Sequence, residues 1–187
     1  CVGDVAACST AGAMNIRNGQ WDAELCEAAG IDMAMLPHLH NPQDNIGTVT
    51  ESAAQRTGFS AGTAVYAGIG DAGATTLASG VSRPGQYNIN IGTSGWIATV
   101  SPEPFTGKPG AANLAFGVEE VFVNAVPFLN AGDVHKWVTG VFADGDYAEA
   151  HQLIETSKPG SNGVMCLPYL VGERFPVMNP NIRGAYV

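Results

Sequence analysis

An aspartate set among glycines is the first candidate for chemistry in this chain. Residues 65–80 read VYAGIGDAGATTLASG, in which three glycines spell G-x-G-x-x-G around Asp71. One interpretation makes Asp71 the cap of a helix, accepting hydrogen bonds from the N–H groups of Gly73 or Ala74. The other makes it a general base, because a helix N-terminus keeps a carboxylate ionised and able to accept a proton. The residues alone leave both interpretations open.

The same glycine pattern is the phosphate-binding turn of dinucleotide-dependent oxidoreductases. That turn needs an acidic residue about 20 positions downstream to hold the ribose hydroxyls. The next acid after Asp71 is Glu103, which is too far along the chain. A carboxylate inside the turn would also repel a pyrophosphate, so a dinucleotide-dependent oxidoreductase is the distant alternative.

A second cluster stands at Gly92, Thr93, Ser94 and Gly95. Glycines let successive N–H groups turn to one side, and hydroxyls add donors, which together make an anion nest for phosphate. The same residues suit an ordinary hairpin turn, and both readings stay open. A serine-hydrolase elbow is not indicated, because Trp96 stands where G-x-S-x-G requires its final glycine.

The remaining polar residues give weaker indications. His38 and His40 share a segment predicted as a solvated loop, and since no further ligand cluster accompanies them, no metal ligand is assigned. The segment ERFPVMNPNIRG carries three charges, which suit a salt-bridged structural lock as well as a site. Those charges belong to Glu173, Arg174 and Arg183.

The elements that would position these residues follow from periodicity and punctuation. A helix is predicted over 22–30, with Asp22 as its cap and an apolar stripe formed by Leu25, Ala28 and Ala29. A second helix is predicted over 48–58, with Thr48 or Thr50 as its cap and Gly58 at its end. Further helices are predicted over 72–79, 131–142 and 146–157, a hairpin over 85–100, a proline-rich loop over 101–113, and strands over 63–68, 118–126 and 163–170. The fold class is therefore mixed α/β, and the change from helical to alternating pattern at 79–86 is the best domain boundary.

Composition excludes several classes of function. Seventeen acidic residues against eight basic ones give a net charge of −9, which repels phosphate backbones and anionic membranes. No apolar run approaches the ~20 residues that a bilayer crossing needs. Four scattered cysteines suggest reduced thiols in a cytoplasmic protein. The start at Cys1 and the end at Val187 lead us to expect part of a longer protein.

Four segments in order and spacing resemble the FGGY carbohydrate kinases. They are VYAGIGDAGATTLASG, NINIGTSGW, NAGDVHKWV and LPYLVGERFPVMNPNIRG, and the last, with GTSG, is similar to the xylulokinase and gluconokinase side of that family. The resemblance implies a two-domain kinase fold of the actin, Hsp70 and hexokinase (ribonuclease H-like) type. It makes 1–82 the last part of a sugar-binding domain and 83–187 the first part of an ATP-binding domain, a central slice that is inactive alone.

The resemblance also implies roles for particular residues and partners. Asp71 matches the family's catalytic base, and the ATP-binding positions match Gly92, Thr93, Ser94, Gly132 and Lys136. ATP would be the co-substrate with Mg²⁺, and the acceptor a sugar, first of all a ketopentose such as D-xylulose. Gluconate or another sugar or polyol, and a non-catalytic sugar- or nucleotide-binding member, are the alternatives. A homodimer is compatible with the resemblance.

Overall fold

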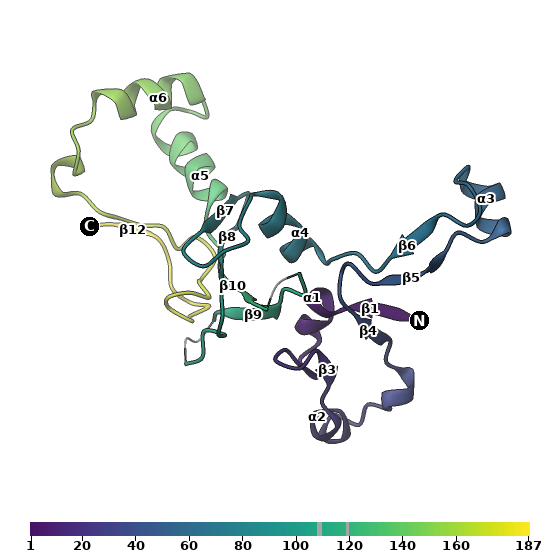
Figure 1. Ribbon diagram of the computed structural model, residues 1–187. Helices are drawn as coiled ribbons and strands as arrows, with labels where there is room; N and C mark the ends of the chain where they lie inside the picture. The colour runs from purple at the N-terminus through teal and green to yellow at the C-terminus, as the bar shows by residue number, and fades with distance from the viewer. Residues whose placement is uncertain (108–109, 119) are drawn as a thin grey trace. The chain divides into compact units, whose positions relative to one another are not determined.

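The computed structural model describes residues 1–107, 110–118 and 120–187 (Figure 1). Lys108 and Pro109 of the predicted loop over 101–113, and Glu119 of the predicted strand over 118–126, lie outside these residues. The chain divides into two compact units. The first comprises Cys1–Asn88, Thr99–Phe105 and Asn113–Asn124, and the second comprises Ile89–Ala98, Thr106–Ala112 and Ala125–Val187.

The first unit is built from short paired strands and short helices. Strand β1 (Val2–Asp4) pairs parallel with β4 (His38–His40), β2 (Met14–Asn15) pairs antiparallel with β3 (Gln20–Trp21), and β5 (Asn45–Thr48) pairs antiparallel with β6 (Ala64–Tyr66). Its helices are α1 (Val5–Cys8), α2 (Ala23–Ala28), α3 (Glu51–Thr57) and α4 (Asp71–Ala78), with 3₁₀ turns η1 (Ser9–Ala11) and η2 (Met33–Met35).

A small apolar core holds the first unit together. Val5, Met14 and Ala115 are buried, and the side chains packed against them are Cys8, Ile16, Trp21 and Leu39. Removing such surface from water is the main favourable term in folding. The indole N–H of Trp21 donates to the Pro37 carbonyl at 2.9 Å, which satisfies the ring's polar atom as its face packs inward.

Local signals in the first unit are partly confirmed. Asp22 caps α2, Thr50 caps α3, and Gly58 ends α3 in the left-handed conformation with φ of 80°. The predicted apolar stripe of α2 is wrong, because only Cys26 is buried in that helix. The prediction of a loop at His38 and His40 is also wrong, since both residues lie in β4, which pairs with the distant strand β1.

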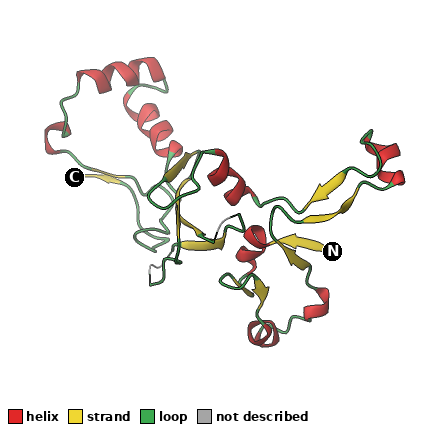
Figure 2. Cartoon of the chain, viewed as in Figure 1, coloured by secondary structure: helices red, strands yellow, loops and turns green. Residues whose placement is uncertain are grey.

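Strands β7 (Tyr87–Ile91), β8 (Gly95–Ser101), β9 (Ala112–Ala115) and β10 (Phe122–Phe128) form one sheet in the order β7-β8-β10-β9. Figure 2 colours the strands yellow and the helices red. The adjacency of β7 and β8 confirms the predicted hairpin. The second unit adds helices α5 (Gly132–Phe142) and α6 (Tyr147–Thr156), turn η3 (Ser161–Gly163), and β11 (Cys166–Leu167) antiparallel to β12 (Ala185–Tyr186). The predicted strand over 163–170 is reduced to the two exposed residues of β11.

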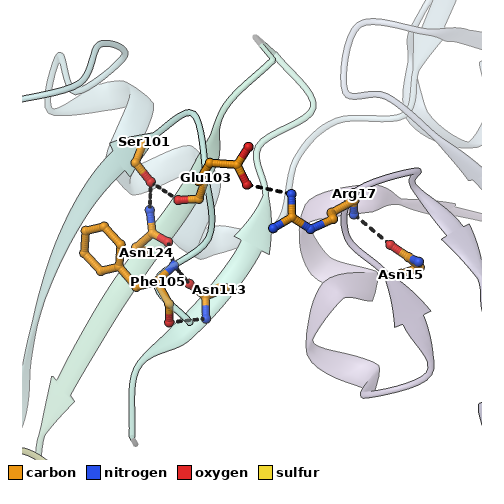
Figure 3. Close-up of polar contacts among 7 residues, drawn as sticks. All are labelled: Asn15, Arg17, Ser101, Glu103, Phe105, Asn113 and Asn124. Atoms are coloured by element: carbon orange, nitrogen blue, oxygen red, sulfur yellow. Dashed lines mark hydrogen bonds and ion pairs between the residues drawn. The ribbon is translucent and has the colours of Figure 1, made fainter. Parts of the chain in front are cut away.

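Asn124 ties the segment after β8 to β10 within the first unit (Figure 3). Its side chain is 1% exposed, donates to the Ser101 hydroxyl at 2.6 Å and accepts the Phe105 N–H at 3.0 Å. Glu103, on the same segment, pairs with Arg17 at 2.6 Å, and both side chains are more than half exposed. The buried amide therefore contributes more to order here than the exposed ion pair.

Among the described residues, no helix is both long enough and apolar enough to span a bilayer.

Candidate functional site

Asp71 is the first residue of α4, and its side chain is exposed. The N-cap is Gly70, and an Asp71 carboxylate oxygen accepts the N–H of Ala72 at 2.8 Å. The predicted capping bonds from Gly73 or Ala74 are therefore wrong. An acidic residue in the first helical turn is still stabilised as an anion by the helix dipole. The carboxylate remains open to solvent and to a ligand.

Asp4, which the sequence analysis missed, positions the turn before Asp71. One Asp4 carboxylate oxygen accepts the N–H groups of Ala6 at 3.0 Å, Ala7 at 2.9 Å and Gly70 at 3.1 Å. It therefore caps α1 and holds the residue that precedes Asp71. An Asp before a short helix is a capping signal in the sequence, but its bond to a residue 66 positions away is not.

Close packing accounts for the glycines around Asp71. A Cβ on Gly70 would lie 2.9 Å from the Cβ of Ala7, and Gly68 has a φ of +76°. Only glycine tolerates such an approach or adopts such a backbone without strain. These glycines therefore allow α4 to pack against α1, with which it is in contact.

The turn over 92–95 lies in the second unit, and Gly92, Thr93 and Ser94 are exposed. The Gly92 N–H donates to the Ser94 carbonyl at 2.9 Å. A Cβ on Gly95 would overlap the Phe128 ring and lie 2.8 Å from the Asn90 carbonyl oxygen. Gly95 is therefore required by packing, whereas the three residues before it face solvent.

The start of α5 is hydrogen-bonded to the carbonyls of this turn. The N–H of Gly132 donates to the Gly92 carbonyl at 2.7 Å, and the N–H groups of Ala131 and Asp133 donate to the Thr93 carbonyl at 3.2 and 3.3 Å. A Cβ on Gly132 would lie only 2.5 Å from the Gly92 oxygen. Gly132 thus allows the helix to approach the turn closely.

Two N–H groups of the exposed turn take no part in these bonds. Within the described part of the chain, the N–H groups of Thr93 and Ser94 have no protein acceptor. Two successive free N–H groups on an exposed turn, with a hydroxyl on each residue, are an arrangement that binds anions. The turn is therefore both a hairpin connection and a candidate phosphate site.

An open pocket of about 440 Å³ lies along α5, the helix that donates hydrogen bonds to this turn, within the second unit. Lys136 lines it, one helical turn after Gly132 and so on the same face of α5. The full lining is Leu129, Asn130, Asp133, Lys136, Trp137, Gly140, Val141, Leu170 and Val171. The structure thus brings Gly92, Thr93, Ser94, Gly132 and Lys136 onto connected elements, while Asp71 belongs to the first unit.

A buried acid, Glu173, holds part of the pocket's lining. Its carboxylate accepts the N–H groups of Leu129 and Arg174, both at 2.8 Å, and the Asn130 side-chain amide at 3.0 Å. Burial acts to raise the pKa of Glu173, but hydrogen bonds from Leu129, Arg174 and other donors outweigh it, and the pKa lies below its ordinary value. No salt bridge joins Glu173 to a cation among the described residues.

Of the two readings left open for this segment, the salt-bridged lock is not formed among the described residues, and hydrogen bonds hold Glu173 instead. Arg183 instead donates to the carbonyls of Pro180 and Ile182, at 2.9 and 2.8 Å. Likewise, no three His, Cys, Asp or Glu side chains among the described residues lie close enough to hold a metal ion.

The chain as a whole is similar to known proteins of one family. Residues 1–78 match the N-terminal domain of the FGGY family of carbohydrate kinases. A xylulose kinase of Bacillus subtilis (strain 168) is 31% identical over 178 residues, which cover 93% of this chain and 35% of the relative. The chain belongs to the FGGY family of carbohydrate kinases.

Two further comparisons extend the likeness over the whole FGGY chain. A gluconokinase of Bacillus subtilis (strain 168) is 28% identical over 194 residues, covering 98% of this chain and 38% of the relative. The crystal structure of a ligand-bound xylulose kinase from Lactobacillus acidophilus matches 100% of this chain and 38% of its own with a TM-score of 0.89 and 26% identity. The predicted α/β kinase fold of the actin and hexokinase type is confirmed, and the FGGY chain spans little more than a third of these relatives' length.

Proposed function

We propose that this FGGY chain serves ATP-dependent phosphorylation of a sugar hydroxyl, first of all of a ketopentose such as D-xylulose. The observation that carries the proposal is the exposed turn over 92–95, whose Thr93 and Ser94 N–H groups lack a protein acceptor among the described residues while α5 holds the turn's carbonyls. The similarity to xylulose kinases and gluconokinases over more than nine-tenths of the chain supports it.

In the proposed reaction, the sugar hydroxyl oxygen attacks the γ-phosphorus of ATP. A new P–O bond forms, the bond to the ADP oxygen breaks, and the hydroxyl proton passes to the Asp71 carboxylate. Such transfers pass through a loose transition state, so that the protein mainly positions the groups and stabilises charge. Asp71 suits the role of the base because it is exposed in the first turn of α4. Asp4 fixes the residue before it by accepting the N–H of Gly70.

The turn over 92–95 would hold the ATP phosphates through the Thr93 and Ser94 N–H groups, as preorganised dipoles do for developing charge. Lys136 would add a cation from the pocket wall. Mg²⁺ remains a prediction: it is held mostly by waters, phosphates and one or two carboxylates, and no step above depends on it. The domain division at 82/83, a homodimer and a cytoplasmic location also remain predictions.

The test is Asp71→Asn in the complete protein, with turnover and melting temperature measured together. Asn keeps an oxygen that can accept the Ala72 N–H but cannot take up the proton. We expect kcat to fall by about 10²-fold or more with an unchanged melting temperature. Glu51→Gln is the matched control, because it removes the acidic group from the first turn of α3 and should leave kcat unchanged. Near-normal turnover in Asp71→Asn would refute the assignment of the base.

The sugar is tested separately by comparing kcat/KM for D-xylulose and D-gluconate with wild-type protein. Both a gluconokinase and a xylulose kinase are among the similar proteins, so membership of the family does not choose between the two sugars. A preference for D-xylulose supports the proposal, and a preference for D-gluconate selects the alternative. ATP and sugar binding without turnover would indicate a non-catalytic member of the family.

A further inference from the structure

Glu173 and Asn130 form a buried pair that no catalytic assignment uses. Their exposed fractions are 5% and 8%. Besides its bond to Glu173, the Asn130 amide donates to the Gly172 carbonyl at 2.7 Å, and its oxygen accepts the N–H groups of Leu170 at 2.8 Å and Val171 at 3.2 Å. Every polar atom of the two side chains is therefore satisfied, which fixes both in one orientation.

This pair fixes the residues that lead into α5. Glu173 accepts the N–H of Leu129, and its bond to the Asn130 side chain fixes the next residue. The N–H groups of the two residues after that, Ala131 and Gly132, donate to carbonyls of the turn over 92–95. A continuous hydrogen-bonded path thus runs from Glu173 to the carbonyls of that turn. The N–H groups of Thr93 and Ser94 in the same turn have no protein acceptor among the described residues, so they are left for a ligand.

The same pair fixes one wall of the pocket that Lys136 lines. Leu170 and Val171 belong to that wall, and Asn130 holds the N–H groups of both. A buried carboxylate is costly unless donors surround it. An apolar pair of similar size could fill the space, but it could not hold four separate backbone N–H groups and one carbonyl in place.

We propose that Glu173 and Asn130 are positioning residues for ATP: together they set the start of α5, the turn over 92–95 and the wall of the Lys136 pocket. The inference rests on the proposed kinase function. Asn130 also lines the pocket, but neither residue is assigned a contact with the reacting atoms, and the proposed effect of both comes through the backbone groups that they hold.

The test uses Glu173→Gln, Asn130→Asp and the double variant in the complete protein. In Glu173→Gln, the new side-chain NH₂ group would face the NH₂ group of Asn130. In Asn130→Asp, the new carboxylate would face the carboxylate of Glu173, so each single change opposes like groups. The double variant restores a donor facing an acceptor at this contact, although Gly172 loses its donor. We expect each single variant to raise KM for ATP at least about tenfold with KM for the sugar within about twofold, and the double variant to recover part of that loss.

Amide hydrogen exchange supplies a readout that needs no nucleotide. The N–H groups of Ala131, Gly132 and Asp133 should exchange faster in the single variants than in wild type, and more slowly again in the double variant. Asn124→Asp is the control for a purely structural loss, because Asn124 is also buried and hydrogen-bonded but lies in the first unit. It should lower the melting temperature without changing KM for ATP.

An unchanged KM for ATP with unchanged exchange at 131–133 in both single variants would overturn the inference, whatever the melting temperatures. So would equal rises of both KM values, or a rise in KM for ATP in Asn124→Asp of the same size. A wild-type protein without ATP-dependent turnover would overturn the proposed function instead. The exchange rates would then still decide whether the pair fixes the start of α5.

Discussion

The close approach of Gly132 to the turn over 92–95 gives the sharpest prediction. In Gly132→Ala, the new Cβ would meet the Gly92 carbonyl oxygen at 2.5 Å, whereas carbon–oxygen contacts in proteins settle at about 3.3–3.6 Å. The helix and the turn must therefore separate by about 1 Å. Because the obstacle is a backbone atom, no side-chain rotation relieves it.

That separation also lengthens the bond from the Gly132 N–H to the Gly92 carbonyl, now 2.7 Å. Overpacking of this kind costs about 1–3 kcal/mol, and a misplacement of about 1 Å at a reacting group can cost 10²-fold in rate. We expect kcat/KM for ATP to fall by about 10²-fold and the free energy of unfolding to fall by about 1–3 kcal/mol. KM for the sugar should stay within about twofold.

The assay is ATP-dependent turnover combined with urea unfolding of the complete protein. Gly140→Ala is the stability control on the same helix, because nothing lies within 4 Å of its added Cβ. Alanine is the better helix former, so this control should gain up to about 1 kcal/mol. If Gly132→Ala matches Gly140→Ala in stability and binds ATP like wild type, the reasoning from the close approach is refuted.

Two further predictions concern buried polar groups. Thr139 and Thr76 are 1% and 0% exposed, but the Thr139 hydroxyl lacks a partner among the described residues while the Thr76 hydroxyl donates to the Ala72 carbonyl at 2.7 Å. In urea titrations, Thr139→Val should therefore raise the free energy of unfolding by about 1 kcal/mol, and Thr76→Val should lower it by about 1 kcal/mol. Equal changes in the two variants would contradict this reasoning. The lowered pKa of Glu173 means that its contribution to stability is complete above the unfolded-state pKa of about 4.3 and is lost as pH falls through the folded-state value. The stability gap between wild type and Glu173→Gln should thus be constant from about pH 7 to 5 and shrink below about pH 4, and a gap that widens in acid would contradict the shift.

Several features of the fold could be predicted from the sequence because their causes are local. Asp22 and Thr50 cap their helices through N–H groups three residues away, and Gly58 ends α3 because it adopts a positive φ. The alternation over 85–100 predicted the hairpin that carries the turn over 92–95. Local chemistry also singled out Asp71 and this turn as candidate sites.

Only the tertiary structure decided how the candidate residues are supported. Asp4 and Gly70 are 66 residues apart, and Asn130 and Glu173 are 43 apart, so that no spacing along the chain shows that they bond. For the same reason, the burial of helix faces was predicted wrongly: a stripe is buried only where a partner covers it, and in α2 the covered residue is Cys26. Local backbone preferences act over a few residues and can be read from the sequence. Hydrogen bonds that close long loops depend on the packing of the whole unit, and these hold the candidate site in place.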